Sequence, residues 1–324
     1  MNSFGRIFRI SIYGESHGPE VGVVIDGCPP GISIQESDFK DDIIRRAPGK
    51  AGTTTRIESD KPRFKSGIYK GYTSGSPLAI SFLNENTISK DYAFEGFHRP
   101  GHADFTASAK YKGFNNPAGS GHFSGRLTLP LVAAGVIAKK IIPEININAE
   151  LIKAGGSENI ESAINKALED NDSIGGVVLC KVNGLKAGYG EPFFDSVESI
   201  ISHAAFSIPG LKAIEFGNGI EAANTKGSEF NDTFISQSGK TKTNNSGGIN
   251  GGITNSNELY FKLYFKPSSS IRKSQKTMNF KTGFIEEFSI SGRHDACYAQ
   301  RVPVVVEAIT AIVLADLVLI ANTL

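Results

Sequence analysis

The stretch Gly14-Glu15-Ser16-His17-Gly18 stands between two segments of alternating apolar residues, 7–13 and 21–25. A period of two predicts β-strands that each bury one face, so we expect a hairpin with this stretch at its turn. His17 then lies where a rigid strand meets a loop, which is a usual position for catalytic side chains. A histidine that only closes a hairpin turn explains the motif equally well. Other parts of the sequence are needed to choose between these two interpretations.

Composition and charge indicate a globular enzyme of one large domain or two. The 324 residues include 34 basic and 33 acidic side chains, which gives a net charge of +1. Without a basic excess, no overall field favours nucleic acid or an anionic membrane, so an anionic ligand has to be bound by cations gathered locally. The 36 glycines predict many turns and close backbone approaches.

Three widely spaced cysteines, Cys28, Cys180 and Cys297, fit a reducing compartment better than a disulfide framework or a zinc site. Residues 1–10 carry two arginines within a strand pattern and lack the apolar core of a secretion signal. We therefore expect a cytoplasmic protein without a metal.

Residues 302–324 are almost wholly apolar and long enough to cross a bilayer. Glu307 and Asp316 interrupt this segment, and each ionised carboxylate near the bilayer centre costs roughly 2.5 to 3.5 kcal/mol. A helix buried between protein layers is the better interpretation, because sheets on more than one side allow it to be apolar all round.

Hydrophobic periodicity, helix-capping residues and turn residues predict the remaining elements. We expect helices at residues 37–46, 102–111, 127–142, 157–169 and 195–206, and strands at residues 64–72, 78–83, 145–152, 175–182, 211–216 and 258–266. Residues 221–253 are polar and rich in glycine. We interpret them as a mobile loop within the domain, with a disordered linker as the alternative.

Arg45 and Arg46 end the predicted helix 37–46 and precede a flexible stretch, 49–56. Two adjacent arginines complement the negative end of a helix dipole, and they also suit a clamp for phosphate or carboxylate. The local sequence favours the clamp only slightly.

The second conspicuous motif is Arg99-Pro100-Gly101-His102-Ala103-Asp104. The Pro-Gly pair predicts a turn, and His102 opens the next helix, where the helix dipole disfavours its positive form. We expect a neutral ring until an anion arrives to pair with it, which suits a proton donor to a phosphate.

A glycine-rich stretch, 117–126, leads directly into the apolar helix 127–142. Unpaired N–H groups at such a helix start can hold an anion such as phosphate, or the pyrimidine edge of a flavin. The spacing matches neither a Walker nor a Rossmann pattern. Ser124 as a simple N-cap explains Ser124 itself, but not Arg126 or the glycines before it.

Five motifs, in this order, resemble the signatures of the chorismate synthase family over residues 4–319. They are Gly14-Glu15-Ser16-His17-Gly18 with Asp26-Gly27, Arg99-Pro100-Gly101-His102-Ala103-Asp104, Ser124-Gly125-Arg126, Lys266-Pro267 with Ser270, and Arg293-His294-Asp295 with Cys297. The resemblance implies an α+β fold in which antiparallel β-sheets sandwich a helical core formed by residues 127–142 and 302–320. It also implies a single domain, 1–324, with the mobile loop at about 221–256, assembled as a homotetramer.

The resemblance further implies a lyase of aromatic amino-acid biosynthesis in the shikimate pathway. Such an enzyme removes phosphate from 5-enolpyruvylshikimate 3-phosphate in a 1,4-anti elimination that gives chorismate. The family requires reduced FMN although no net redox change occurs, and NADPH is a candidate reductant. By motif match, the catalytic residues are His17 beside the flavin N1 edge, His102 beside the leaving phosphate, and Asp295, which takes a proton from flavin N5.

The same motif match implies binding residues. The flavin contacts are His122, Phe123, Ser124, Pro209, Gly210, Gly251, Lys266, Pro267, Ser268, Ser269, Ser270 and Arg293, and the substrate contacts are Arg45, Arg46 and Arg126. A substrate with two carboxylates and a phosphate needs cations gathered in one cleft, which agrees with arginines in or beside each motif.

The chain also departs from the family pattern. Ala47 stands where many members have a third arginine, the loop at Gly52 is one residue shorter, and His122 and Phe123 replace arginine and serine. These departures motivate an alternative, a homologue that binds FMN or a phosphorylated metabolite but has lost catalysis. Nucleic-acid binding is a third hypothesis, disfavoured because the chain lacks a basic excess and interleaved aromatic residues.

Overall fold

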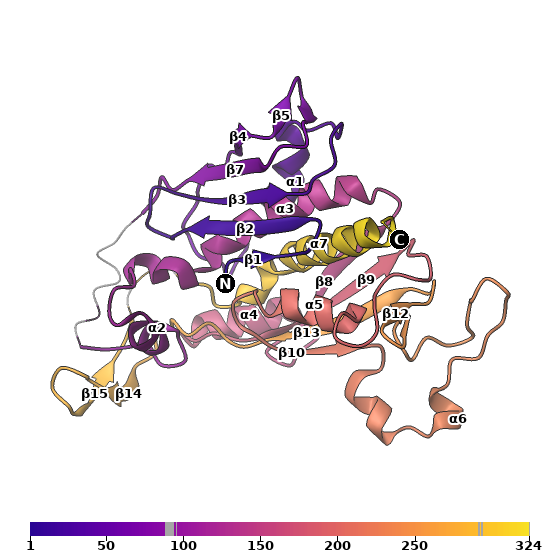
Figure 1. Ribbon diagram of the computed structural model, residues 1–324. Coiled ribbons are helices and arrows are strands. Elements are labelled where there is room, and N and C mark those ends of the chain that lie inside the picture. Colours follow the sequence, from indigo (N-terminus) through magenta and orange to yellow (C-terminus); the bar gives the residue numbers. More distant parts are fainter. Residues whose placement is uncertain (88–93, 95, 291, 293, 324) are drawn as a thin grey trace.

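The computed structural model describes residues 1–323 except 88–93, 95, 291 and 293, and it contains two large antiparallel sheets with helices between them (Figure 1). The first sheet has the strand order β1-β2-β3-β7-β4. Its strands are β1 (Ser3–Phe4), β2 (Arg9–Gly14), β3 (Glu20–Asp26), β7 (Leu78–Leu83) and β4 (Arg63–Ser66). Ile12 pairs with Val23 across β2 and β3, so the predicted hairpin with His17 in its connection is confirmed.

The second sheet has the strand order β10-β13-β9-β8. Its strands are β10 (Leu211–Phe216), β13 (Leu259–Phe265), β9 (Gly176–Asn183) and β8 (Asn146–Ala154). Every second residue of β13 is buried, beginning with Leu259 and ending with Phe265, as strict alternation requires of a strand that buries one face.

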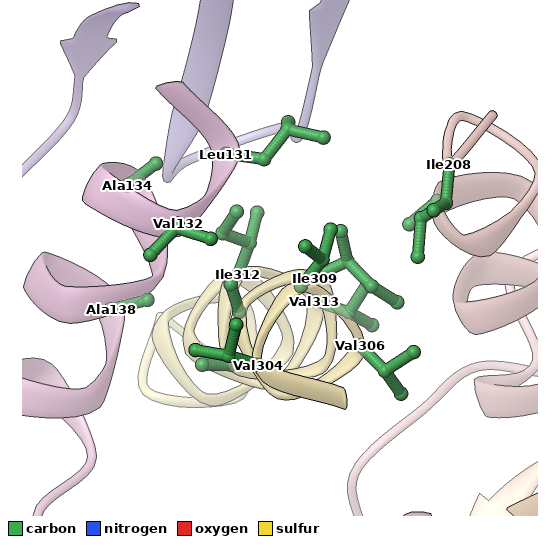
Figure 2. Packing of buried hydrophobic residues seen from close by; sticks show 14 of the residues in the cluster. Leu131, Val132, Ala134, Ala138, Ile208, Val304, Val306, Ile309, Ile312 and Val313 are labelled. Atoms are coloured by element: carbon green, nitrogen blue, oxygen red, sulfur yellow. The ribbon is translucent and has the colours of Figure 1, made fainter. Parts of the chain in front are cut away.

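The helices α3 (Thr128–Ile141) and α7 (Pro303–Ala321) join the two sheets. Helix α3 contacts β2, β3 and β7, while α7 contacts β8, β9, α3 and α5 (Val197–Ala205). In Figure 2, Val132 of α3 and Ile312 of α7 point toward one another. The helices approach closely at Gly135, where an added Cβ would lie 2.4 Å from the Cβ of Ala308.

Helix α7 passes the length and hydropathy test for a membrane span, but 83% of its most apolar window is buried inside the protein. Its two carboxylates have partners. Asp316 accepts the backbone N–H groups of Arg6, Ile7 and Phe8 at 2.7 to 2.8 Å. Glu307 accepts two hydrogen bonds from Arg45, at 2.6 and 2.7 Å, and lies 3.3 Å from Nζ of Lys139. Paired in this way, the carboxylates are tolerated in a buried helix, as the sequence predicted.

Several element boundaries differ from the predictions for local reasons. Helix α4 (Ile160–Glu169) begins later than expected, because the side chain of Asn159 caps it by accepting the N–H of Ser162. Helix α5 likewise begins after Ser196, whose side chain accepts the N–H of Ser199. The expected helix 37–46 is a 3₁₀ helix, η1 (Glu36–Phe39), followed by α1 (Lys40–Arg46), and the expected strand 64–72 is divided into β4 and the small hairpin β5 (Ile68–Tyr69) and β6 (Tyr72–Thr73).

The glycine-rich region folds into short elements that project from the second sheet (Figure 1). These are η5 (Gly219–Asn224), α6 (Gly227–Phe230), β11 (Ile249–Asn250) and β12 (Ile253–Thr254). Asp232 organises the region by accepting the hydroxyl of Thr243 and the N–H groups of Asn245 and Ser246 at 2.7 to 2.9 Å. The mobility of residues 221–256 stays a prediction.

The remaining elements lie around one end of the two sheets. They are α2 (Asp104–Tyr111), the 3₁₀ helices η3 (Ala118–Phe123), η4 (Gly125–Leu127) and η6 (Tyr298–Arg301), and a projecting hairpin of β14 (Gln275–Met278) and β15 (Ile285–Phe288). Most of the sequence motifs lie in or beside these elements, whereas the first lies between β2 and β3 and the Lys266-Pro267 motif follows β13. Residues of all five motifs line one cavity.

Candidate active site

A cavity of about 770 Å³ lies where these motifs meet, and its volume is typical of a site for small-molecule ligands. Its apolar side is formed by Ile10 and Ile12 of β2, Leu131 of α3, and Ile309 and Ile312 of α7. Its polar side carries cations and carboxylates, namely Arg46, Arg56, Arg99, Arg126, Lys266 and Arg301 together with Glu58, Asp60 and Asp295. Cations outnumber carboxylates, so the cavity suits an anionic ligand that also has an apolar face.

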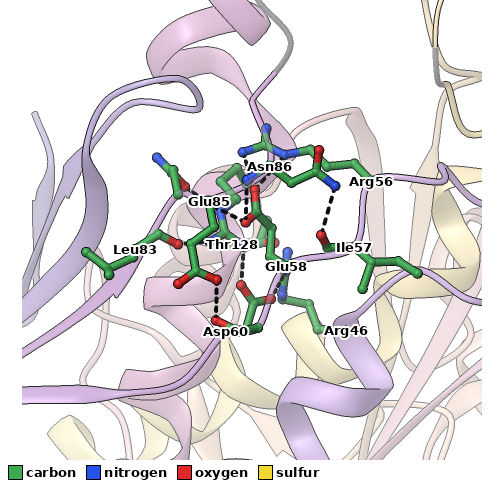
Figure 3. A network of polar contacts seen from close by, with 12 residues as sticks. Arg46, Arg56, Ile57, Glu58, Asp60, Leu83, Glu85, Asn86 and Thr128 are labelled. Atoms are coloured by element: carbon green, nitrogen blue, oxygen red, sulfur yellow. Dashed lines mark hydrogen bonds and ion pairs between the residues drawn. The ribbon is translucent and has the colours of Figure 1, made fainter.

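The segment 54–60 lies in the cavity wall and forms hydrogen bonds to several other parts of the chain. Figure 3 shows Arg56, Glu58 and Asp60 of this segment among their partners. Arg56 donates to Oγ and to the carbonyl oxygen of Ser16 at 2.8 and 3.0 Å, and to Glu58 at 2.7 and 2.9 Å. The second oxygen of Glu58 accepts the backbone N–H groups of Glu85 and Asn86. Burial acts to raise the pKa of Glu58, but these donors hold it below its ordinary value.

Asp60 joins two buried arginines. Its Oδ2 accepts from Arg46 at 2.8 Å and its Oδ1 accepts from Arg126. Arg126 also donates to Asn84 Oδ1 at 2.9 Å and to the carbonyl oxygen of Leu83 at 3.0 Å. Burial acts to raise the pKa of Asp60, but the two guanidiniums outweigh it and hold that pKa below its ordinary value. Burial lowers the pKa of Arg46 to about 10, which leaves this side chain a cation at neutral pH.

Arg99 connects the second motif to two other loops. It donates to both carboxylate oxygens of Asp104 at 2.8 Å, to Oγ of Ser120 at 3.1 Å and to Oγ of Ser270 at 3.1 Å. Nδ1 of His102 lies 2.6 Å from Oδ1 of Asp104. The sequence prediction considered only the helix start beside His102, and the structure adds the carboxylate of Asp104 as a direct partner of the ring.

The glycine-rich stretch makes a sharp turn beside the first motif. Gly119, Ser120 and Gly121 have φ of 59°, 71° and 51°, a left-handed conformation that glycine adopts easily. A Cβ at Gly119 would lie 2.3 Å from Cδ2 of His17, so only glycine fits against this ring. The carbonyl oxygen of Gly121 accepts the N–H of Ser16 at 3.0 Å. His17 therefore packs against the cavity wall at Gly119.

Asp295 lies in the wall contributed by the last motif. Its Oδ1 accepts the N–H of Thr54 at 2.8 Å, and Arg301 lies 3.3 Å from Oδ2. The short loop at Gly52 supports this segment, because the carbonyl oxygen of Gly52 accepts the N–H of Ala296 at 2.8 Å. A Cβ at Gly52 would lie 2.5 Å from the side chain of Ile164, so this loop is closely packed.

The segment after β13 closes another side of the cavity. Nζ of Lys266 donates to Oγ of Ser269 at 2.6 Å, and that hydroxyl donates to the carbonyl oxygen of Gly101 at 2.8 Å. Burial, and then the nearby Lys212, lower the pKa of Lys266. The segment is thereby attached to the loop that carries His102.

The structure brings together most of the residues that the sequence nominated. The cavity is lined by His102, Asp295, Arg46, Arg126, His122, Phe123, Ser124, Pro209, Gly210, Lys266, Pro267, Ser268, Ser269 and Ser270. His17 contacts the loop behind this lining, at Gly119. Nε2 of His122 lies 3.1 Å from Oδ1 of Asn2, so the N-terminal strand also takes part in the wall.

Two nominated residues lie elsewhere, and one is outside the described residues. Arg45 does not line the cavity, because its guanidinium turns away from Arg46 to bind Glu307 and Asp42. Gly251 sits in the turn between β11 and β12, with open space where a Cβ would point. Arg293 belongs to the part of the chain that the structure does not describe.

The sequence reasoning missed the segment 54–60 and Arg301. The available signal was the placement of Thr54, Arg56, Glu58 and Asp60 at every second position, which in an extended chain turns all four to one side. Among the described residues no group of histidine, cysteine and carboxylate side chains could hold a metal ion, and Cys28, Cys180 and Cys297 are free and buried.

Comparisons with known proteins agree with the geometry. The family model described as chorismate synthase matches residues 8–319. A protein of Chitinophaga pinensis named chorismate synthase is 55% identical over 322 residues, covering 99% of this chain and 97% of its own. A protein of the same name from Dehalococcoides mccartyi is 41% identical, with 99% and 97% covered. A crystal structure titled chorismate synthase has a TM-score of 0.75 at 23% identity, covers 98% of this chain and 93% of that chain, and supports the fold.

Proposed function

Because the chain belongs to the chorismate synthase family, whose members are carbon–oxygen lyases, we propose that the cavity is where it eliminates phosphate from 5-enolpyruvylshikimate 3-phosphate to give chorismate. The observation that carries this proposal is the convergence of His102, Asp295 and the arginines 46, 56, 99, 126 and 301 on one cavity with an apolar side. The alternative of a homologue without catalysis is not favoured, since the identity extends over nearly the whole chain.

The residues of the cavity fit a reduced FMN beside an anionic substrate. Ile10, Ile12 and Leu131 offer an apolar surface for a flat ring, while Lys266 and the serines 268–270 offer donors for a phosphate. Gly210 has φ of 88° and only the Lys266 side chain near the position of a Cβ, so the backbone there is open to a ligand. When bound, reduced FMN supplies electron density to the substrate and is regenerated without net redox change.

The protein's own residues bind the substrate and move protons. We assign the anionic groups of the substrate to the cations on the polar side of the cavity, with Arg46 and Arg126 set by Asp60. His102 donates a proton to the departing phosphate, and the carboxylate of Asp295, 3.3 Å from Arg301, would accept the proton from a bound flavin. His17, which packs behind Gly119, would stabilise the edge of a bound flavin.

Three further assignments belong to this proposal. We assign the chain the family's arrangement of two sheets around the core helices α3 and α7, supported by the contacts of each helix with a different sheet. We assign reduction of the flavin to a cellular reductant and not to NADPH bound by this chain, because Ala47 and the short loop at Gly52 depart from the family pattern. We also propose a homotetramer, supported by the exposed Phe280, Phe284 and Ile285 around the projecting hairpin.

An anaerobic assay with chemically reduced FMN and 5-enolpyruvylshikimate 3-phosphate, with and without NADPH, tests the proposal. We expect release of phosphate and formation of chorismate in both conditions. His17→Ala, His102→Ala and Asp295→Ala should remain folded and lose nearly all turnover, whereas His98→Gln, outside the cavity lining, should keep it. If purified protein with reduced FMN releases no phosphate, the assignment fails.

A further inference from the structure

We propose that Asp104 is a positioning residue that fixes a proton on Nδ1 of His102 and thereby makes Nε2 the atom that delivers a proton in the cavity. The inference rests on the proposed function, because it concerns the residue assigned to protonate the departing phosphate. The proton donor then consists of His102 together with Asp104, and Arg99 holds this pair in place.

The geometry of the carboxylate carries the first step. Asp104 Oδ1 lies 2.6 Å from Nδ1 of His102 and accepts from Arg99 Nη2 at 2.8 Å. Oδ2 accepts from Nε and from the backbone N–H of Arg99 at 2.8 and 3.0 Å. Arg99 is itself 4% exposed and is held by Ser120 and Ser270. The carboxylate therefore has one orientation, set by a buried guanidinium.

The short distance decides which ring nitrogen carries the proton. Burial acts to raise the pKa of Asp104, but hydrogen bonds from Arg99 and His102 hold it far below its usual range, so the carboxylate has no proton to donate. A lone pair on Nδ1 would then face an anionic oxygen at 2.6 Å, which is repulsive. Nη2 of Arg99 lies 3.0 Å from the same nitrogen but already donates to the carboxylate and to Ser120. Nδ1 is therefore the donor to Asp104.

The consequence concerns the other nitrogen. With Nδ1 occupied by Asp104, the Nε2 edge of His102 is the edge available to a ligand in the cavity that the ring lines. A proton on Nε2 makes the ring an imidazolium, whose charge the carboxylate compensates. Transfer of that proton to a phosphate oxygen, as the carbon–oxygen bond breaks with its electron pair leaving on oxygen, returns the ring to its neutral form with Nδ1 still protonated.

The other charged groups around His102 differ in whether they favour or oppose a positive charge on its ring. Arg99 on the same loop opposes a positive ring. Lys266 belongs to the facing segment, where it holds Ser269 against Gly101, and it opposes a positive ring as well. Asp295 and Arg301 line the same cavity as an ion pair. Among the residues that the structure describes, Asp104 alone forms a hydrogen bond to the ring that favours its positive form, so the pH dependence of proton donation should follow Asp104.

The test is Asp104→Asn in the full chain with reduced FMN, compared with Asp170→Asn on the surface. An asparagine can present its N–H₂ group to Nδ1 and impose the wrong tautomer, as the corresponding change does in serine proteases. We expect kcat to fall by about 10²-fold or more, because the proton donor is disabled. KM for the substrate should change by less than about threefold, since binding in the ground state is unaffected. The alkaline limb of kcat/KM should move to lower pH, with Asp170→Asn like the wild type.

A second measurement does not depend on turnover. The Nδ1 proton in so short a hydrogen bond should give a strongly deshielded resonance in the proton NMR spectrum of the wild type, absent from His102→Gln and shifted or lost in Asp104→Asn. Absence of that resonance from the wild type would overturn the proposal, as would an Asp104→Asn variant whose pH profile keeps both limbs in place. A wild type without turnover would refute the proposed function while leaving the resonance as the test of the hydrogen bond.

Discussion

The guanidinium of Arg56 donates to both oxygens of Ser16, at 2.8 Å to Oγ and 3.0 Å to the carbonyl oxygen. Ser16 is 1% exposed and directly precedes His17. Glu58 in turn holds Arg56 through two hydrogen bonds. The orientation of the turn that carries His17 thus depends on a segment about 40 residues further along the chain.

We expect Arg56→Met to lower the free energy of unfolding by about 3 kcal/mol, because the enclosed carboxylate of Glu58 loses its charged partner. Turnover should fall as well, since the turn at Ser16 loses its support. Urea unfolding and the anaerobic assay measure the two effects. Arg63→Met, at an exposed position of β4, is the matched control and should change neither. Equal unfolding midpoints for the two variants would show that the contacts of Arg56 are energetically unimportant.

Asp60 should make the stability of the protein depend on pH. Its pKa is lower in the folded chain than in the unfolded one, so the unfolded state binds more protons as the pH falls. The stabilisation by Asp60 is therefore complete above the unfolded pKa of about 4 and is lost below it, as the pH passes through the folded value.

We accordingly expect Asp60→Asn to be about 3 kcal/mol less stable than the wild type at pH 7. This difference in the free energy of unfolding between the variant and the wild type should become smaller as the pH falls below about 4. Urea midpoints measured across this range give the comparison, with Asp170→Asn as a surface control. A gap that stays constant from neutral to acidic pH would contradict the ion pairs with Arg46 and Arg126 as its source.

Much of the scaffold was predictable because its signals are local. Alternation in residues 259–265 identifies β13 without reference to any other part of the chain, and two carboxylates in an apolar segment were enough to predict that α7 is buried. The convergence of the site was predicted through the family resemblance, since the motifs were recognised together. The spacing of the first motif alone did not distinguish a catalytic role for His17 from a role in closing the hairpin turn.

The parts that failed depend on direction and on distant partners. Arg45 and Arg46 are neighbours in sequence, but successive residues on a helix point about 100° apart, so one reaches Glu307 and the other the cavity. Asp60 pairs with Arg126, which lies 66 positions further along the chain. No local sequence pattern predicts a pair between such distant residues. The hairpin of β14 and β15 lies between two motifs, and the sequence analysis did not predict its strands.

Asp316 should attach the N-terminal strand to the core. Its carboxylate accepts three successive backbone N–H groups, from Arg6 to Phe8, just after β1, which lines the cavity. We expect Asp316→Ala to lower the free energy of unfolding by about 3 kcal/mol, since one buried and two partly buried N–H groups lose their acceptor. Hydrogen exchange at residues 6–8 should become faster. Thr310→Val on the same helix loses a bond to its own turn and a weak contact with Sγ of Cys180 at 3.9 Å, and it should change the free energy of unfolding by less than about 1 kcal/mol. Unchanged exchange in Asp316→Ala would refute the attachment.

Gly119 should be the least replaceable position of the glycine-rich turn. It has φ of 59°, and a Cβ there would lie 2.3 Å from Cδ2 of His17 and 2.8 Å from Oγ of Ser16. Gly119→Ala therefore adds a collision to the ordinary strain of a left-handed alanine, which is about 1 kcal/mol.

Gly113→Ala separates the two effects, because Gly113 has φ of 80° and nothing within 4 Å of its Cβ position. We expect Gly113→Ala to show the strain alone with normal turnover, and Gly119→Ala to lose turnover about 10²-fold or more, because the ring of His17 would no longer be oriented to stabilise the flavin edge. Equal behaviour of the two variants would mean that the ring of His17 can move aside without cost and that its fixed place behind Gly119 is not needed for the reaction.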